Sequence, residues 1–138
     1  MKLYDTRSNQ CENTYSVNAQ ATCLTLAHNS QYFLTGTSNG DIHVVDFDRM
    51  DRKQPLAILK GTTQNQAVTS IDISPKGFHV VAGYNDGTVK VWNLNTGKSE
   101  VLKTTSTQNP IIDAKFSPDG RYLGIADSSG NIHIYIYI

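Results

Sequence analysis

Short apolar runs separated by turn residues recur along this chain, and their spacing predicts an all-β fold. Three segments align without a gap, and their first residues lie 47 and 43 positions apart. They read ATCLTLAHNSQYFLTGTSNGDIHVVDF (21–47), VTSIDISPKGFHVVAGYNDGTVKVWNL (68–94) and IIDAKFSPDGRYLGIADSSGNIHIYIY (111–137). A repeat of this length indicates one small structural unit used several times.

Each segment divides into three strands, here termed a, b and c, joined by two turns. The turn between a and b reads S-P-K-G at Ser74–Gly77 and S-P-D-G at Ser117–Gly120, which is typical of a β-turn closed by glycine. The turn between b and c contains Asn39-Gly40, Asp86-Gly87 and Ser129-Gly130. The first two of these pairs predict two-residue hairpins, with both central residues at positive φ.

A fourth strand, d, is expected at Pro55–Lys60 and again at Ser99–Thr104, between the segments. No window of eleven residues shows the spacing of an amphipathic helix without turn residues in it. In strand c of the second segment, valines alternate with Lys90 and Trp92, so bulky side chains occupy both faces. Such a strand belongs inside a stack of sheets, and we expect Trp92 to pack between neighbouring sheets.

A four-stranded antiparallel unit at this period is typical of a β-propeller blade. Ser74–Gly77, Ser117–Gly120 and above all Asp86–Asn93 (D-G-T-V-K-V-W-N) make the chain resemble the WD40 family. The family's Trp-Asp pair is degenerate in every blade. It appears as Val45-Asp46, Trp92-Asn93 and Tyr135-Ile136.

The resemblance implies one partial propeller over residues 1–138, an arc of about three four-stranded blades. Strands c and d of a preceding blade are expected in 1–19, with Leu3–Asp5 as strand c, Tyr4 in the column of Trp92, and strand d at Thr14–Asn18. Three blades follow, at 21–60, at 68–104 and at 111–138, the last without its outer strand. Propellers close into rings of 4 to 8 blades. We therefore expect further blades on both sides, or else two copies that associate into a ring.

Gly36–Gly40 (G-T-S-N-G) matches G-x-S-x-G, the turn that presents a nucleophilic serine in many hydrolases. That turn needs a helix after the serine, with a histidine and a carboxylate nearby. A strand follows Ser38 instead, and the repeat aligns it with Asn85 and Ser128. Ser38 is therefore interpreted as a turn residue, and no catalytic residue is expected.

Other motifs favour structural interpretations in the same way. Gly97-Lys98-Ser99 resembles the end of a phosphate-binding loop but lacks its first glycine and its helix. His43 and His133 share a column with Lys90 and are expected to face solvent. Neither the cysteines, Cys11 and Cys23, nor the histidines have the spacing of a metal site, so no metal or cofactor is expected.

The charge balance and cysteine content limit the classes of partner and the setting expected for this chain. Twelve basic and twelve acidic side chains cancel, and the pI is near 6.9. No direct contact with nucleic acid or a membrane surface is expected from this charge. No segment approaches the roughly 20 apolar residues of a membrane-spanning helix. The two cysteines suit a reducing, intracellular and most simply cytoplasmic setting, although one pair also permits a single disulfide.

The resemblance implies a non-catalytic scaffold that binds protein or peptide partners within an intracellular complex. In the family, the d–a loops and b–c turns form the face that most often meets partners. The matching candidate residues here are Ser38, Asn39, Thr63, Gln64, Asn65, Asn85, Asp86, Gln108, Asn109 and Ser128. They could equally be solvated loops. Two more specific alternatives are a cytoskeletal or ciliary propeller that binds actin or tubulin, and a propeller of ribosome-biogenesis or chromatin machinery.

Overall fold

The computed structural model describes residues 2–8, 10–17, 19–28, 31–48, 54–61, 65–102 and 109–136. Within these ranges the chain forms thirteen β-strands and no α-helix. The expected all-β fold is confirmed. No helix in this part of the chain is long and apolar enough to cross a membrane.

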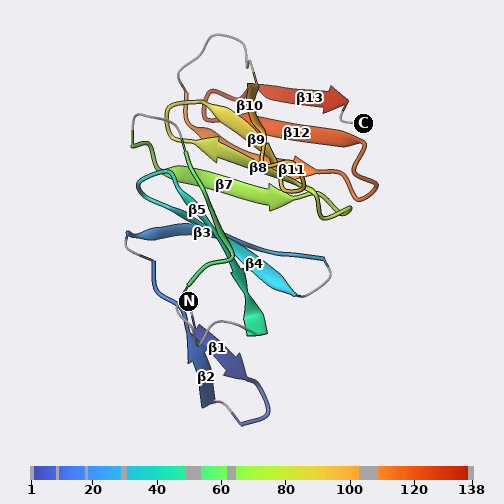
Figure 1. Ribbon diagram of the computed structural model, residues 1–138. Helices are drawn as coiled ribbons and strands as arrows, with labels where there is room; N and C mark the ends of the chain where they lie inside the picture. Colours follow the sequence, from blue (N-terminus) through green and yellow to red (C-terminus); the bar gives the residue numbers. More distant parts are fainter. Residues whose placement is uncertain are drawn as a thin grey trace.

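The strands form four antiparallel sheets that follow one another along the chain (Figure 1). The N-terminal hairpin contains β1 (Lys2–Asp5) and β2 (Gln10–Thr14). Sheet I contains β3 (Ala21–Leu26), β4 (Tyr32–Thr37), β5 (Ile42–Asp46) and β6 (Ala57–Leu59). Sheet II contains β7 (Val68–Ile73), β8 (His79–Tyr84), β9 (Val89–Asn93) and β10 (Ser99–Leu102). Sheet III contains β11 (Ile111–Phe116), β12 (Tyr122–Asp127) and β13 (Ile132–Ile136).

Each sheet keeps its strands in chain order, so every pair of neighbours is a hairpin. The expected fourth strands are present as β6 and β10. The first strands of the three sheets, β3, β7 and β11, lie side by side. The described sheets form an open row with the N-terminal hairpin at one end and sheet III at the other (Figure 1).

The turns between a and b strands have the predicted form. Gly77 donates its N–H to the Ser74 carbonyl at 2.7 Å, and Gly120 donates to the Ser117 carbonyl at 2.9 Å. Both glycines have positive φ, at 80° and 74°. These turns place the next strand directly beside the first.

The turns between b and c strands differ from the prediction. Only their glycines have positive φ, which is 95° at Gly40, 87° at Gly87 and 93° at Gly130. The residues before them do not, so the expected two-residue hairpins are wrong. In sheet II, the Tyr84 N–H donates to the Thr88 carbonyl across a three-residue loop that ends in Gly87. A turn of this kind needs one left-handed residue after a tight turn, and glycine is the residue that takes this conformation without strain.

Strand d of the N-terminal hairpin begins earlier than predicted, at Gln10 instead of Thr14. Asp5 accepts a hydrogen bond from the Arg7 N–H at 2.8 Å, which tightens the turn and returns the chain at once. Tyr4 therefore pairs with Cys11, and Trp92 pairs with Ser99. In both pairs the partner lies seven residues later in the chain. The assignment of Tyr4 to the column of Trp92 is thus consistent with the observed register.

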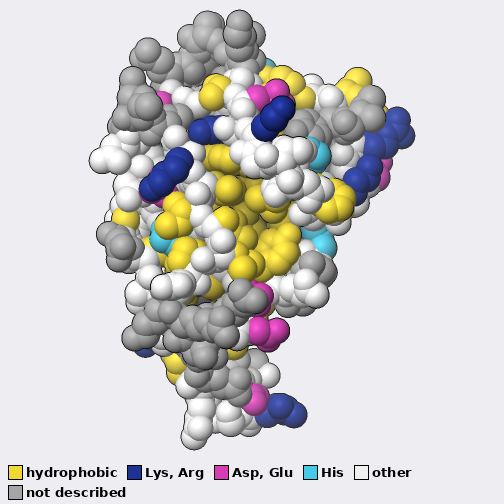
Figure 2. Space-filling view, in the orientation of Figure 1, with side chains coloured by type: hydrophobic (Ala, Val, Ile, Leu, Met, Phe, Trp, Pro, Cys, Tyr) yellow, Lys and Arg dark blue, Asp and Glu magenta, His cyan; other side chains and the backbone are white. Residues whose placement is uncertain are grey.

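Sheet II is packed on both faces. Trp92 is only 4% exposed and lies in a core shared with sheet I, while Val89 and Val91 lie in a second core shared with sheet III. Hydrophobic side chains gather over the middle of one face of the molecule, at the level of β5 and β7 (Figure 2). The expectation that Trp92 packs between sheets is confirmed.

Close approach between sheets depends on two glycines in b strands. A Cβ atom added at Gly36 would lie 2.7 Å from Cγ1 of Val68, and one added at Gly83 would lie 2.2 Å from Cγ2 of Ile111. The first residues of β7 and β11 therefore sit directly on the b strand of the preceding sheet, at positions where a residue larger than glycine would clash.

The outer faces of the row expose apolar side chains. At the N-terminal end, Tyr15 packs on Phe33 and Val45 and covers part of sheet I, whereas Leu24 and Leu26 stay about half exposed. At the other end, three side chains of β13 point into solvent. These are Ile132 (72% exposed), Ile134 (65%) and Ile136 (72%).

Candidate interaction edge

The turns between b and c strands lie beside the ends of the d–a loops in all three sheets. Ser38 donates its N–H to the Gln20 carbonyl at 2.8 Å. The matching bonds run from Asn85 to Ala67 (3.1 Å) and from Ser128 to Pro110 (2.9 Å). Because each acceptor immediately precedes an a strand, the same bond fixes both loops at one edge of every sheet.

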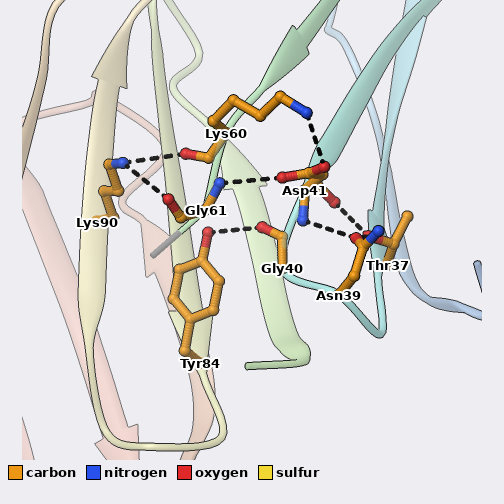
Figure 3. Close-up of polar contacts among 8 residues, drawn as sticks. All are labelled: Thr37, Asn39, Gly40, Asp41, Lys60, Gly61, Tyr84 and Lys90. Carbon is orange, nitrogen blue, oxygen red and sulfur yellow. Dashed lines mark hydrogen bonds and ion pairs between the residues drawn. The ribbon is translucent and has the colours of Figure 1, made fainter. Parts of the chain in front are cut away.

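A polar network joins sheets I and II at this edge (Figure 3). The hydroxyl of Tyr84 donates to the Gly40 carbonyl at 3.0 Å, and Nζ of Lys90 donates to the Lys60 carbonyl at 3.0 Å. Both bonds cross from sheet II to sheet I or to the segment that follows it. Tyr84 is fully buried, and burial raises the pKa of its hydroxyl, so it stays a neutral donor.

Asp41 extends this network within sheet I. Its carboxylate accepts from Nζ of Lys60 at 3.2 Å and from the Gly61 N–H at 3.3 Å. Its backbone N–H donates to Oδ1 of Asn39, which also receives the hydroxyl of Thr37 (Figure 3). The start of the d–a loop is therefore tied to the b–c turn of the same sheet.

In sheet III the corresponding turn is organised by a single carboxylate. Asp127 accepts from the N–H and hydroxyl of Ser129, at 3.0 and 2.7 Å, and from the N–H of Asn131 at 3.0 Å. Donors that favour the charged form, Ser129 first, lower the pKa of Asp127 to about 2. Thr37, Tyr84 and Asp127 occupy the same position of the repeat, and each makes different hydrogen bonds.

The candidate partner-facing residues that the structure describes fall into three groups. Asn85 and Ser128 expose their side chains at the edge, and Asn65 is exposed with a positive φ of 58°. Asn39 and Asp86 instead use their side-chain oxygens inside the turns, where Oδ1 of Asp86 accepts from the Thr88 N–H at 3.0 Å.

Ser38 and Asn109 are half-buried. Thr63, Gln64 and Gln108 lie outside the described residues. The structure therefore brings together the turn residues of the candidate set at one edge, with Asn65 and Asn109 a few residues before their a strands.

Among the candidate residues, Asp86 is the one charged side chain. The structure adds Asp41, Lys60 and Lys90 beside the turns. The Leu-Lys pair at 59–60 and 102–103, nine and eight residues before the second and third segments, is the sequence signal for this lysine. The carboxylate partner had no repeated signal.

Ser38 lies in the turn between β4 and β5, as interpreted from the repeat. The prediction that His43 faces solvent is wrong. His43 is half-buried, and its Nδ1 lies 2.9 Å from the hydroxyl of Tyr15. Burial lowers the pKa of His43, because the segment around Tyr15 crosses this face of sheet I. Cys11 and Cys23 do not form a disulfide bond.

Among the described residues, no group of three or more His, Cys, Asp or Glu side chains is arranged to hold a metal ion. A shallow groove of about 420 Å³ lies along β9 and β10, away from the candidate edge, and includes His79, Asn93, Lys98 and Glu100. The groove contains one positive side chain, Lys98, and one negative side chain, Glu100, but the described residues that line it form no ion pair.

Four-stranded antiparallel sheets whose first strands lie side by side, with loops gathered at one edge, define a β-propeller of the WD40 class. Residues 8–136 match the Vps8 β-propeller family, and the chain belongs to that family.

Several curated relatives are similar over most of this chain. The target of rapamycin complex subunit LST8 of Bos taurus is 25% identical over 143 aligned residues, which cover 97% of this chain and 42% of the relative. Autophagy-related protein 18 of Meyerozyma guilliermondii is 28% identical over 116 residues, covering 79% of this chain and 20% of the relative. The U3 small nucleolar RNA-associated protein 12 of Saccharomyces cerevisiae is 24% identical over 150 residues, covering 98% and 15%. The chain thus spans less than half of each of these relatives.

Proposed function

We propose that this chain is a non-catalytic scaffold that binds protein or peptide partners at the edge formed by the b–c turns and d–a loops. The observation that carries the proposal is the recurring bond from Ser38, Asn85 and Ser128 to the residue before each a strand. This bond fixes equivalent loops to the same edge of each packed sheet, and loops held by a rigid scaffold are where such folds place recognition.

The chemistry of the edge favours an extended peptide. Asn85, Ser128 and Asn65 offer amide and hydroxyl groups. Of the charged groups nearby, Lys60 pairs with Asp41, and Lys90 donates to the Lys60 carbonyl. Such a surface can hydrogen-bond a backbone or polar side chains, and its described residues form no cluster of like charges that would bind an anion.

A place within a multiprotein intracellular assembly is part of the proposal. One relative is by its name a subunit of the target of rapamycin complex, so a propeller similar to this chain serves in a complex. We further propose that the blades at 21–60, 68–104 and 111–138, with strands c and d of another blade in 1–19, belong to a longer propeller. The exposed Leu24, Leu26 and Ile134 favour cover by further sheets on both sides.

The test is affinity purification of the full-length protein with mass spectrometry of the proteins that accompany it. The edge variant carries Asn85→Arg and Ser128→Arg, because both side chains are exposed while only their backbone N–H groups hold the turns. Loss of at least one accompanying protein from the variant, at unchanged expression, supports the proposal.

A matched control carries Asn95→Arg and Lys76→Glu, two exposed positions in the c–d and a–b turns at the opposite edge of sheet II. It should retain every partner. If the two variants lose the same proteins, or neither loses any, the candidate edge is not the binding surface.

A second candidate is a scaffold in ribosome-biogenesis machinery, favoured by the similarity to a U3 small nucleolar RNA-associated protein. The balanced charge of this chain favours protein contacts over RNA contacts in such a setting. The same purification separates the two, because recovery of ribosome-assembly proteins from nuclear extract would select this candidate. No observation favours the cytoskeletal alternative.

A further inference from the structure

The second residue of β5 and the second residue of β9 both contact the segment that follows the outer strand of the preceding sheet. In β9 this residue is Lys90, and its Nζ donates to the carbonyls of Lys60 and Gly61, at 3.0 and 3.4 Å, directly after β6. In β5 it is His43, and its Nδ1 lies 2.9 Å from the hydroxyl of Tyr15, directly after β2. The two contacts therefore join neighbouring sheets at the same position of the repeat.

The two contacts differ in how they respond to pH. Lysine side chains stay charged between about pH 5 and pH 8, whereas histidine is the side chain whose charge changes in this range. The contact of Lys90 therefore keeps its charge over a range in which the contact of His43 can change.

The surroundings of His43 favour the neutral ring. Across the sheet, His43 lies between Thr35 of β4 and Ile58 of β6, and neither of these side chains ionises. The ring of Tyr15 packs edge-on against it, with the ring centroids 6.1 Å apart, and Tyr15 is only 2% exposed. A positive charge on His43 would therefore be partly cut off from water.

The charged groups near His43 do not compensate for this burial. Burial lowers the pKa of His43, whereas among the described residues Asp41 acts to raise this pKa and Lys60 to lower it. Asp41 and Lys60 also pair with each other at 3.2 Å, so their effects on His43 offset one another.

Protonation would also change the hydrogen bond to Tyr15. While Nδ1 of His43 has no proton, it can accept from the Tyr15 hydroxyl, which burial keeps neutral by raising its pKa. The imidazolium has protons on both nitrogens and can accept at neither. The hydroxyl would then have to reorient at a buried position, which weakens the contact.

We propose that the contact between His43 and Tyr15 is a pH-sensitive switch, in which neutral His43 holds the N-terminal hairpin on sheet I and protonated His43 loosens it. Charging His43 is harder when the hairpin is docked than when it is released. The stabilisation is therefore complete above about pH 6.5, the ordinary value for histidine, and is lost as the pH falls through the lowered pKa of His43. The contact uses none of the candidate partner-facing residues, so the proposal does not depend on the proposed function.

The test is amide hydrogen exchange of the 138-residue chain at about pH 7.5 and about pH 5.5, with each rate divided by the intrinsic rate of the unfolded peptide at that pH. A two-stranded hairpin is barely stable by itself, so loosening it from sheet I exposes its amides to exchange. Protection of residues 10–17 should fall roughly two- to tenfold at the lower pH, as expected for the loss of one hydrogen bond. Protection of β8 and β9 should change less, and an equal fall there overturns the proposal.

A variant locates the titrating group. His43→Gln places at this position an amide that does not titrate and can still accept from the Tyr15 hydroxyl. The ratio of protection between the two pH values should fall to about one in this variant. His28→Gln is the matched control, because His28 is exposed, and it should keep the full change. A His43→Gln variant that keeps the pH dependence of the parent overturns the proposal.

A second measurement uses the unaltered chain and so does not depend on how well a variant folds. NMR titration of the His43 imidazole should give a midpoint below the ordinary histidine value of about 6.5. A midpoint at or above that value overturns the proposal, because protonation would then not oppose docking of the hairpin.

Discussion

At the scale of single residues, identical positions of the repeat perform related tasks with different chemistry. Thr37 bonds within its own turn, Tyr84 reaches across to the neighbouring sheet, and Asp127 gathers donors from its own turn. Only the backbone geometry is common to the three. The backbone conformation of the glycine in each turn is therefore more constrained than the polar side chain that precedes the turn.

Gly87→Val tests that constraint. The φ of Gly87 is 87°, and a β-branched residue at positive φ is strained. We expect a loss of about 1–3 kcal/mol in the free energy of unfolding, measured by urea denaturation. Thr25→Val, at a half-buried position of β3, is the control and should change stability much less. A Gly87→Val variant as stable as the parent would show that the turn is misplaced.

Tyr84→Phe tests the bond between sheets I and II. The change removes the hydroxyl that donates to the Gly40 carbonyl at 3.0 Å and leaves the ring in place. We expect a loss of roughly 1–2 kcal/mol in the free energy of unfolding, because the buried carbonyl loses its partner. Tyr122→Phe is the matched control, since Tyr122 is 41% exposed and should be near neutral. Equal effects of the two changes would contradict the role of Tyr84.

The carboxyl group of Asp127 should titrate at unusually low pH. Its pKa is lowered to about 2 in the folded chain, below the value of about 3.9 for an unperturbed aspartate. Its contribution to stability is therefore complete above about pH 4 and is lost as the pH falls toward 2. Carbon-detected NMR of the side-chain carboxyl measures the midpoint directly. A midpoint at the ordinary aspartate value would mean that the Ser129 and Asn131 donors do not hold it.

At the scale of elements, the packing of one sheet on the next depends on a small residue in each b strand. Val68 sits on Gly36, and Ile111 sits on Gly83. The third sheet has Ala126 in that column and Gly124 two residues earlier. The outer face of sheet III therefore differs in shape from the faces of sheets I and II that carry Gly36 and Gly83.

Gly83→Ala tests this contact between sheets. The added Cβ would lie 2.2 Å from Cγ2 of Ile111, so we expect a loss of roughly 1–3 kcal/mol in unfolding free energy. Gly83→Ala should cost less in an Ile111→Ala background than in the parent, because Ile111→Ala removes Cγ2, the nearest atom, and leaves Cβ at 2.7 Å. Thermodynamic additivity of the two changes would show that the residues do not touch.

At the scale of the whole molecule, the sheets differ in how much cover they receive. Sheet II is packed on both faces, whereas the N-terminal hairpin and β13 each have an uncovered side. Because each sheet is stabilised by contacts with the adjacent sheets, the free energy of local unfolding varies along the stack.

Amide hydrogen exchange should be slowest in the sheet that is packed on both faces and faster in the elements with an uncovered side. We expect the slowest amide exchange in β8 and β9 and the fastest, among the strands, in β1 and β2, because opening sheet II exposes two cores. Mass spectrometry of deuterium uptake in the 138-residue chain measures it. Equal protection in all sheets would indicate that the stack opens only as one unit.

Much of the fold was readable from the order of the amino acids. Periodic Val, Ile and Tyr, with glycine at fixed positions, specify strands and turns because these are local properties of the backbone and of side-chain alternation. The repeat also identified Ser38 as a turn residue and Trp92 as a core residue. The turn type was misread, because Asn-Gly and Asp-Gly suit two hairpin geometries and only the strand register selects one.

Other features were decided only by tertiary structure. The half-burial of His43 against Tyr15, the reach of Tyr84 to Gly40, and the association of Lys60 and Lys90 at the edge all join residues 28 to 44 positions apart. Local preference carries no information about such pairs, because the distance between them is set by how one sheet stacks on the next. The sequence alone determined that the chain builds blades, and the stacking determined which polar groups meet at their edges.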